Sequence, residues 1–370
     1  MTPPMLQIRN IDINITHPFP ISAGHHFFPI DFCPAVQQVR LTNLDIQYLG
    51  GHLHALTRLA VENVLGLPDL STLVAILQAA PALESLDLGG PCKNVRESIA
   101  HLEAMDTDLP VRLPGMKRMV LRSDPEFTKD FFSIVSTPPS TDVVICLPVI
   151  SLRGIQPAFI CDALPDADRL SNLEGLGDIN GLCLRFHGKV PSIMGFRTGV
   201  GCRPLLSLMI VDTTYPPGRT PHPNVVSAIV RAIHFLGISG RITSVELMSD
   251  EEENGEEHKL DLSAVFRALP NLHALSLSMP SLGSVLAALT CTDAGDEVVC
   301  AKLKEMQLLD VWFDDGLVID LMDCLERRQE MDAGPLRSLE LCASKGLSVD
   351  HEGMLGAMVG RLVCHTKVSR

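Results

Sequence analysis

Clusters of cysteine, histidine and acidic residues are the first places to look for chemistry in this sequence. Cys183 and His187 stand four residues apart, a spacing that zinc ligands use, but no second pair completes a site. The acidic residues at 293–297 lack the order of a calcium-binding loop, and His25 and His26 fit a turn or surface position. The chain has no GxGxxG, P-loop, GxSxG or HExxH motif. The sequence therefore predicts no metal site, no cofactor and no enzymatic activity.

Arginine side chains offer a second kind of chemistry, the binding of anionic groups. Several arginines stand beside the apolar residues of short alternating segments, so they are expected on the exposed face of strands. Neighbouring strands would bring such side chains to within about 5 Å of one another, and several guanidinium groups could then bind one carboxylate or phosphate. The candidate partner-binding arginines are Arg40, Arg58, Arg118, Arg122 and Arg185. The alternative is that they only solvate an exposed face. The equivalent positions from residue 205 onward are acidic, small or apolar.

The single tryptophan is a further candidate. Trp312 follows a predicted strand in the sequence DVWFDD, where loops of a repeat protein line a binding rim. Tryptophan is enriched at binding hot spots. The neighbouring Phe313 indicates that one of the two rings belongs to the core, so a core position is the alternative for Trp312.

A repeated pattern indicates which elements position these residues. The stretch LVAILQAAPALESLDL at 73–88 returns as LSAVFRALPNLHALSL at 262–277. In both, apolar residues at i, i+3, i+4 and i+7 predict a helix, a proline follows, and the spacing Φ-x-x-Φ-x-Φ, where Φ is apolar, predicts a short strand. This strand pattern recurs about twelve times, on average about every 30 residues, which is typical of repeat proteins.

The fold follows from how such units are connected. A helix that returns the chain to start the next strand beside the last makes the strands parallel, and a unit buries its apolar face only against its neighbours. We therefore expect an α/β curved solenoid of about 11–12 irregular units, with parallel strands on the concave face and helices on the convex face. It should be a single domain over residues 1–370, with an acidic loop insertion at 249–259 and a C-terminal helix at about 351–363.

Composition limits the classes of partner. A net charge of −14 argues against nucleic acid and anionic membranes, because phosphate contacts need a basic face. The chain lacks both an apolar run long enough to span a bilayer and the features of a secretory signal at its start. The eleven cysteines have no paired spacing, as expected of reduced thiols. A monomer in the cytoplasm or nucleus is expected.

Several runs along the chain share one leucine-rich pattern. They are P-x-L-x-x-L-x-L at 81–88 and 270–277, LKEMQLLDVWFDDGLVIDLMDCLERR at 303–328 and LRSLELCASKGL at 336–347. Together they resemble the irregular leucine-rich repeats of fungal F-box proteins. Regular repeats of this type place Asn or Cys three residues after the last strand leucine, but here Val64, Pro91 and Asp124 hold such positions, so irregular turns are expected. No F-box is found before the first strand-like unit, LQIRNIDINI, which suggests a fragment or a relative that lost this module.

The resemblance implies a leucine-rich-repeat-like solenoid that recognises proteins without catalysing a reaction. It would be the substrate-binding part of an F-box-type ubiquitin ligase receptor, and the cullin-ligase adaptor would be a partner only if an F-box lies outside this chain. The target would be a protein that presents an acidic or phosphorylated segment to the arginines. One alternative is a stand-alone leucine-rich repeat regulator, an inhibitor or a GTPase activator. Another is an enzyme on a parallel β-helix, which the long helical connectors disfavour.

Overall fold

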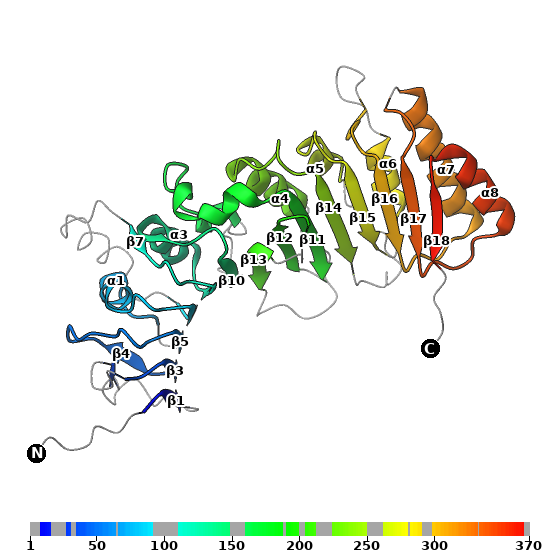
Figure 1. The fold of residues 1–370 in the computed structure, drawn as a ribbon. Helices are drawn as coiled ribbons and strands as arrows, with labels where there is room; N and C mark the ends of the chain where they lie inside the picture. The colour runs from blue at the N-terminus through cyan, green and yellow to red at the C-terminus, as the bar shows by residue number, and fades with distance from the viewer. Residues whose placement is uncertain are drawn as a thin grey trace, which may run out of the picture. The chain divides into compact units, whose positions relative to one another are not determined.

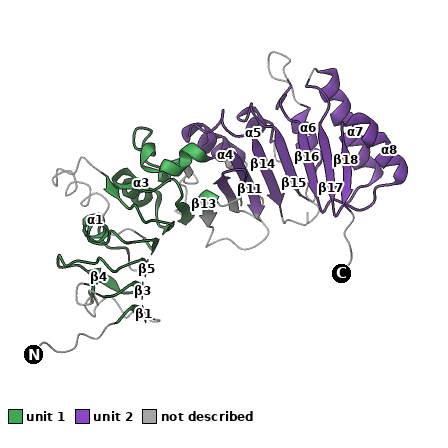
Figure 2. Ribbon diagram, viewed as in Figure 1, with its two compact units in different colours: residues 1–178, 204–214 green, residues 179–203, 215–370 purple. Residues whose placement is uncertain are grey.

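A computed structural model describes residues 8–15, 27–30, 35–63, 66–91, 110–148, 160–187, 190–199, 204–211, 224–249, 262–279, 282–290, 298–331 and 333–365. Within these residues the fold is mixed α/β, as predicted, with seven α-helices and fourteen strands of mostly parallel sheet. The chain divides into two compact units (Figure 2): unit 1 holds residues 1–178 and 204–214, and unit 2 holds residues 179–203 and 215–370. The single domain expected over residues 1–370 stays a prediction.

Unit 1 is built on seven parallel strands in the order β1-β3-β5-β6-β8-β10-β13. They are β1 (Asn10–Asn14), β3 (Gln38–Thr42), β5 (Arg58–Glu62), β6 (Ser85–Gly89), β8 (Arg118–Arg122), β10 (Asp142–Pro148) and β13 (Pro204–Val211). Two short parallel pairs accompany them: β2 (Phe27–Pro29) with β4 (Asp45–Gln47), and β7 (Val111–Arg112) with β9 (Val135–Ser136). The helical segments are α1 (Leu70–Ala79), α3 (Pro125–Ile134) and the 3₁₀ turns Ile160–Ala163, Leu170–Asn172 and Glu174–Asp178. Figure 1 shows α1 and α3 on the same side of these strands.

Unit 2 holds the other seven strands, in the order β12-β11-β14-β15-β16-β17-β18. They are β11 (Gly181–His187), β12 (Val190–Phe196), β14 (Ser244–Ser249), β15 (Ala274–Ser278), β16 (Glu305–Leu309), β17 (Ser338–Cys342) and β18 (Leu362–His365). Its helices are α4 (Asn224–Phe235), α5 (Ser263–Arg267), α6 (Gly283–Leu289), α7 (Asp315–Glu330) and α8 (Val349–Met358). Consecutive helices pack against one another along one side of the strands (Figure 1).

Local sequence explains where these helices begin and what they bury. The side chain of Asp69 accepts a hydrogen bond from the backbone N–H of Thr72 at the start of α1, and Asp124 caps α3 in the same way. The predicted helical stripe of α1, Leu73, Ile76 and Leu77, is at most 1% exposed. Alternate strand residues such as Leu86 and Leu88 are fully buried. The core of unit 1 therefore lies between the helices and one face of the strands.

The second copy of the repeat is built in the same way. Leu262, Val265, Phe266 and Leu269 are all fully buried around α5, and the chain then enters β15 after Pro270. This confirms the helix–proline–strand unit predicted from the two similar stretches. The acidic run expected as a loop insertion at 249–259 lies, apart from residue 249, outside the described residues.

Strand order departs from the sequence order expected in the middle of the chain. If each strand started beside the last, β11 would lie between β10 and β13. Instead β10 pairs in parallel with β13, while β11 pairs with β14. The other edge of β11 is taken by β12, an antiparallel strand that the sequence did not predict. A Cβ on Gly181 would lie 2.4 Å from the ring of its cross-strand partner Phe196, so a glycine here lets the two strands approach closely.

The C-terminal helix predicted at about 351–363 is wrong in its second half. Helix α8 begins one residue after its cap Ser348 and ends at Met358, and Val359 already has extended backbone angles. The backbone N–H of Gly360 donates to the carbonyl of Leu336, which directs the following residues along β17. Residues Leu362–His365 then form β18, because pairing with β17 satisfies their backbone groups.

Candidate functional site

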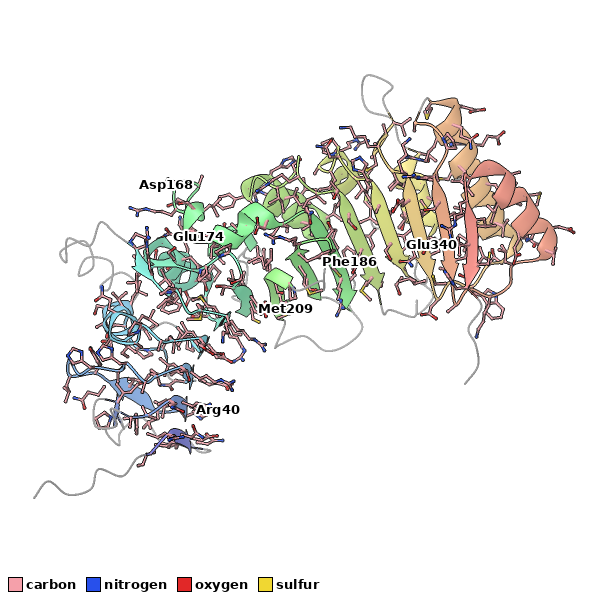
Figure 3. All side chains as sticks on the ribbon, in the orientation of Figure 1. Arg40, Asp168, Glu174, Phe186, Met209 and Glu340 are labelled. Carbon is pink, nitrogen blue, oxygen red and sulfur yellow. The ribbon has the colours of Figure 1, made fainter. Side chains whose placement is uncertain are left out.

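The strands of each unit have one face that the helices do not cover. Successive strand residues point to opposite sides, so the residues between the buried leucines point away from the helices. We call this side the open face. Arg40 illustrates it in Figure 3, where its label lies on the side of the strands away from α1. The five candidate arginines lie on these open faces, so the open faces are the candidate binding surfaces.

On unit 1 the open face consists of three rows of residues that cross the strands in register. The rows are, in strand order, Asn10, Gln38, Arg58, Ser85, Arg118 and Asp142; Asp12, Arg40, Ala60, Asp87, Val120, Val144 and Ser207; and Asn14, Thr42, Glu62, Gly89, Arg122, Cys146 and Met209. Charged residues of both signs occur in each of these rows. The face is therefore mixed in charge.

Four of the five candidate arginines lie on this face, but no two are direct cross-strand neighbours. Arg58 and Arg118 lie on either side of Ser85, about 10 Å apart across two strand spacings. Arg40 has Asp12 on one side and Ala60 on the other. The predicted spacing of about 5 Å between arginines is wrong, because each one faces a different residue type on the next strand. The guanidinium groups form a spaced array.

Carboxylates partly compensate these arginines. Arg122 donates from Nη2 to Oδ2 of Asp87 at 2.8 Å, with both side chains partly exposed. Burial raises the pKa of Asp142, while the nearby Arg118 lowers it. Oδ1 of Asp87 and Oδ1 of Asp142 are buried without a hydrogen-bond partner. Such buried acceptors are costly to leave unsatisfied, so they reduce the stability of this face.

Apolar side chains lie among these charges. Val120 and Cys146 are buried on the open face, and Val144 and Met209 (Figure 3) are half-buried. Burial raises the pKa of the Cys146 thiol, with Arg122 opposing and Asp87 reinforcing the shift. The thiol is therefore protonated at neutral pH and behaves as a small apolar group.

The fifth arginine, Arg185, belongs to unit 2. Its Nε is buried without a hydrogen-bond partner. It lies near Cys183, whose pKa is raised by burial and by Glu246, with Arg185 opposing. Cys183 and Glu246 begin a cross-strand row that continues through Ser276, Gln307 and Glu340. The open face of unit 2 is thus acidic and polar around a single arginine.

Hydrogen bonds link the last part of this row. Ser276 Oγ donates to Oε1 of Gln307 at 3.2 Å, and Gln307 Nε2 donates to Oε2 of Glu340 at 3.3 Å and to Sγ of Cys342 at 3.5 Å. His365 on β18 is the cross-strand partner of Cys342. No sequence motif groups Glu340, Cys342 and His365. The spacing of Glu340 and Cys342 on one strand was a usable signal, but His365 had been assigned to no strand.

Trp312 lies on the surface of unit 2, between β16 and α7. It is 70% exposed and forms a β-bridge with Lys345, whereas Phe313 is 2% exposed. The core position considered for one of the two rings is therefore taken by Phe313. Trp312 is left available for contact with a partner.

Comparison with family models and with curated proteins assigns the chain to no family. A scan against models of protein families finds no match, and a search of curated proteins finds no relative. No helix in the described part of the chain has both the length and the apolar character needed to cross a bilayer. The function has to be argued from the open faces themselves.

Proposed function

We propose that this chain is a non-enzymatic protein-recognition module, shaped as a leucine-rich-repeat-like curved solenoid with strands on its concave side and helices on its convex side. One observation carries the proposal: the open face of unit 1 sets half-buried apolar residues, Val144 and Met209, among charged residues of both signs. Protein–protein interfaces have this composition, with an apolar centre and a polar rim.

The arginines would bind an acidic or phosphorylated segment of the partner. Among the described residues, Arg40, Arg58 and Arg118 form no salt bridge, whereas Arg122 is held by Asp87 at 2.8 Å. Their spacing suits several charges distributed along an extended segment better than one small anion. Arg185 and Trp312 would add contacts from unit 2 only to a partner that also binds there.

The particular role we propose rests on the resemblance to fungal F-box proteins. The chain would be the substrate-binding part of an F-box-type ubiquitin ligase receptor, with the F-box supplied outside this sequence. The alternative is a stand-alone leucine-rich repeat regulator, an inhibitor or a GTPase activator. Both roles use the open face in the same way, and they differ in whether a ligase adaptor accompanies the target.

A purification experiment tests the recognition surface. The tagged chain would be recovered from its source cells as wild type, as the triple variant Arg40→Glu/Arg58→Glu/Arg118→Glu, and as the control Arg112→Glu. Arg112 is exposed on β7 in the same unit but outside the open face, so it controls for the effect of charge reversal alone. We expect one abundant protein to co-purify with wild type and control, and to be reduced at least tenfold with the triple variant. Equal recovery with all three proteins would reject the arginine surface.

The same preparations separate the two roles. Recovery of a cullin together with its adaptor would support the ligase receptor. A target without adaptor or cullin would favour either the stand-alone regulator or a receptor whose F-box is not part of the tagged chain. Circular dichroism of the triple variant checks that charge reversal has left the fold intact.

A further inference from the structure

Three side chains at the last two strands of unit 2 place metal-ligating atoms together. Glu340 and Cys342 project from the same face of β17, two residues apart, and His365 on β18 is the cross-strand partner of Cys342. A carboxylate oxygen of Glu340, Sγ of Cys342 and an imidazole nitrogen of His365 all lie within 4.8 Å of one another. Tetrahedral zinc sites hold their ligand atoms about 3.5 Å apart. Changes in side-chain rotation that move these ligand atoms by about 1 Å would bring them to that spacing.

We propose that Glu340, Cys342 and His365 bind a divalent metal ion of the zinc class. The combination of one sulfur, one nitrogen and one oxygen ligand fits Zn²⁺, whereas Ca²⁺ and Mg²⁺ prefer sites made of oxygen alone. Binding converts the Cys342 thiol to a thiolate and releases its proton to the solvent. Three protein ligands leave the fourth tetrahedral position for water or for a group from a partner.

Neighbouring residues support two of the ligands. Gln307 Nε2 donates to both Glu340 and Cys342, at 3.3 and 3.5 Å. Ser276 donates to the amide oxygen of Gln307 at 3.2 Å, which directs the Gln307 nitrogen toward those ligands. Donors to ligating carboxylates and thiolates orient them and are a regular feature of metal sites. The polar row of the open face thus acts as the outer support of the site.

The position of the site in the fold suggests what the metal does. Strand β18 has four residues and is an edge strand whose described neighbour is β17. A metal bound to Glu340 and Cys342 on β17 and to His365 on β18 would link the two strands across the sheet. Zinc should therefore slow hydrogen exchange in β18 more than in β14 or β15 of the same unit. This site is independent of the arginine surface on unit 1.

Co²⁺ allows metal binding to be measured directly, because it occupies zinc sites and, unlike Zn²⁺, absorbs visible light. The reduced, chelator-treated full chain is titrated with Co²⁺ and then with Zn²⁺. We expect a thiolate-to-cobalt absorption band with visible bands of four-coordinate cobalt, at one ion per chain, displaced by Zn²⁺. Cys342→Ser should abolish the thiolate band, and His365→Gln should weaken Co²⁺ binding strongly. Gln307→Ala, which removes only the outer support, should cost about 10- to 100-fold in affinity.

Cys364→Ser is the matched control. Cys364 is an exposed thiol beside His365, but its cross-strand partner is Leu341, so its side chain points to the other face. The Cys364→Ser variant should bind Co²⁺ with the same affinity and the same absorption bands as wild type. The proposal is overturned if wild type gives no thiolate band, or if the band survives Cys342→Ser and disappears with Cys364→Ser. His365 is at an exposed strand edge, so His365→Gln tests the site even if Cys342→Ser fails to fold.

Discussion

Replacement of Arg328 by methionine tests what stabilises the C-terminal end of α7. Arg328 is 1% exposed. Its Nη1 donates to the carbonyls of Leu289 at 3.3 Å and Val299 at 3.0 Å, and its Nη2 donates to the carbonyl of Cys300 at 3.0 Å. Nε is buried without a partner, and burial lowers the pKa of the guanidinium, with Cys324 and Cys300 opposing. One side chain therefore joins α7 to the end of α6 and to residues 299–300.

Two opposing effects decide the outcome of Arg328→Met. Methionine fills much of the same volume and removes a buried charge, whose desolvation costs several kcal/mol. It also leaves three carbonyl oxygens without their donors, at about 1 kcal/mol or more each. We expect the second effect to win, because charge-assisted hydrogen bonds to three acceptors already offset the desolvation. The free energy of unfolding should fall by about 3 kcal/mol, roughly a hundredfold in the ratio of folded to unfolded chains.

Urea unfolding followed by circular dichroism measures the change in the free energy of unfolding. Hydrogen exchange of peptides from α6 and α7 shows whether these two helices are the part that is destabilised. Arg327→Met is the control, because Arg327 is the exposed neighbour on the same helix and should change stability by less than about 0.5 kcal/mol. If Arg328→Met is as stable as wild type or more so, desolvation of the charge dominates. The three hydrogen bonds then do not stabilise the fold in the way argued above.

Two further predictions concern a carboxyl group and a turn. Burial raises the pKa of Asp130 from 3.8 to about 6, so the folded state favours its protonated form and the free energy of unfolding should fall as pH rises between these values. Asp130→Asn should flatten this part of the profile in urea titrations, and an unchanged slope would contradict the assignment. Gly346 has φ +84°, and a Cβ there would lie 2.1 Å from the carbonyl oxygen of Phe313, so Gly346→Ala should destabilise by about 1–3 kcal/mol. Gly353→Ala, in open space on α8, should instead raise the melting temperature, and a decrease for both would show that the clash is not the cause.

Much of the secondary structure could be predicted from short patterns. The apolar stripe of Leu73, Ile76 and Leu77 indicates α1, and the spacing of Leu83, Leu86 and Leu88 indicates β6, because both depend on residues a few positions apart. The C-terminal segment was harder. Leu362 to His365 is too short to show a period of its own, and pairing with β17 makes it a strand.

The candidate site was predictable only as a set of exposed positions. Alternation places Arg58 and Arg118 on the open face. The strand register decides that Ser85 lies between them and that Asp87 pairs with Arg122. Glu340 and Cys342 were visible as alternating residues on one strand. His365 joins them only because β18 lies beside β17.

Short patterns in the sequence specify the buried stripes of α1 and α5 and the strand residues that point away from the core, because periodicity acts over a few residues. Contacts between distant parts of the chain decide that β13 pairs with β10 and which side chains meet across the open faces. The physical reason is that backbone hydrogen bonds between strands satisfy any sequence equally well. Partner and register are selected by packing among residues far apart in the chain, such as Val143 beside Leu206.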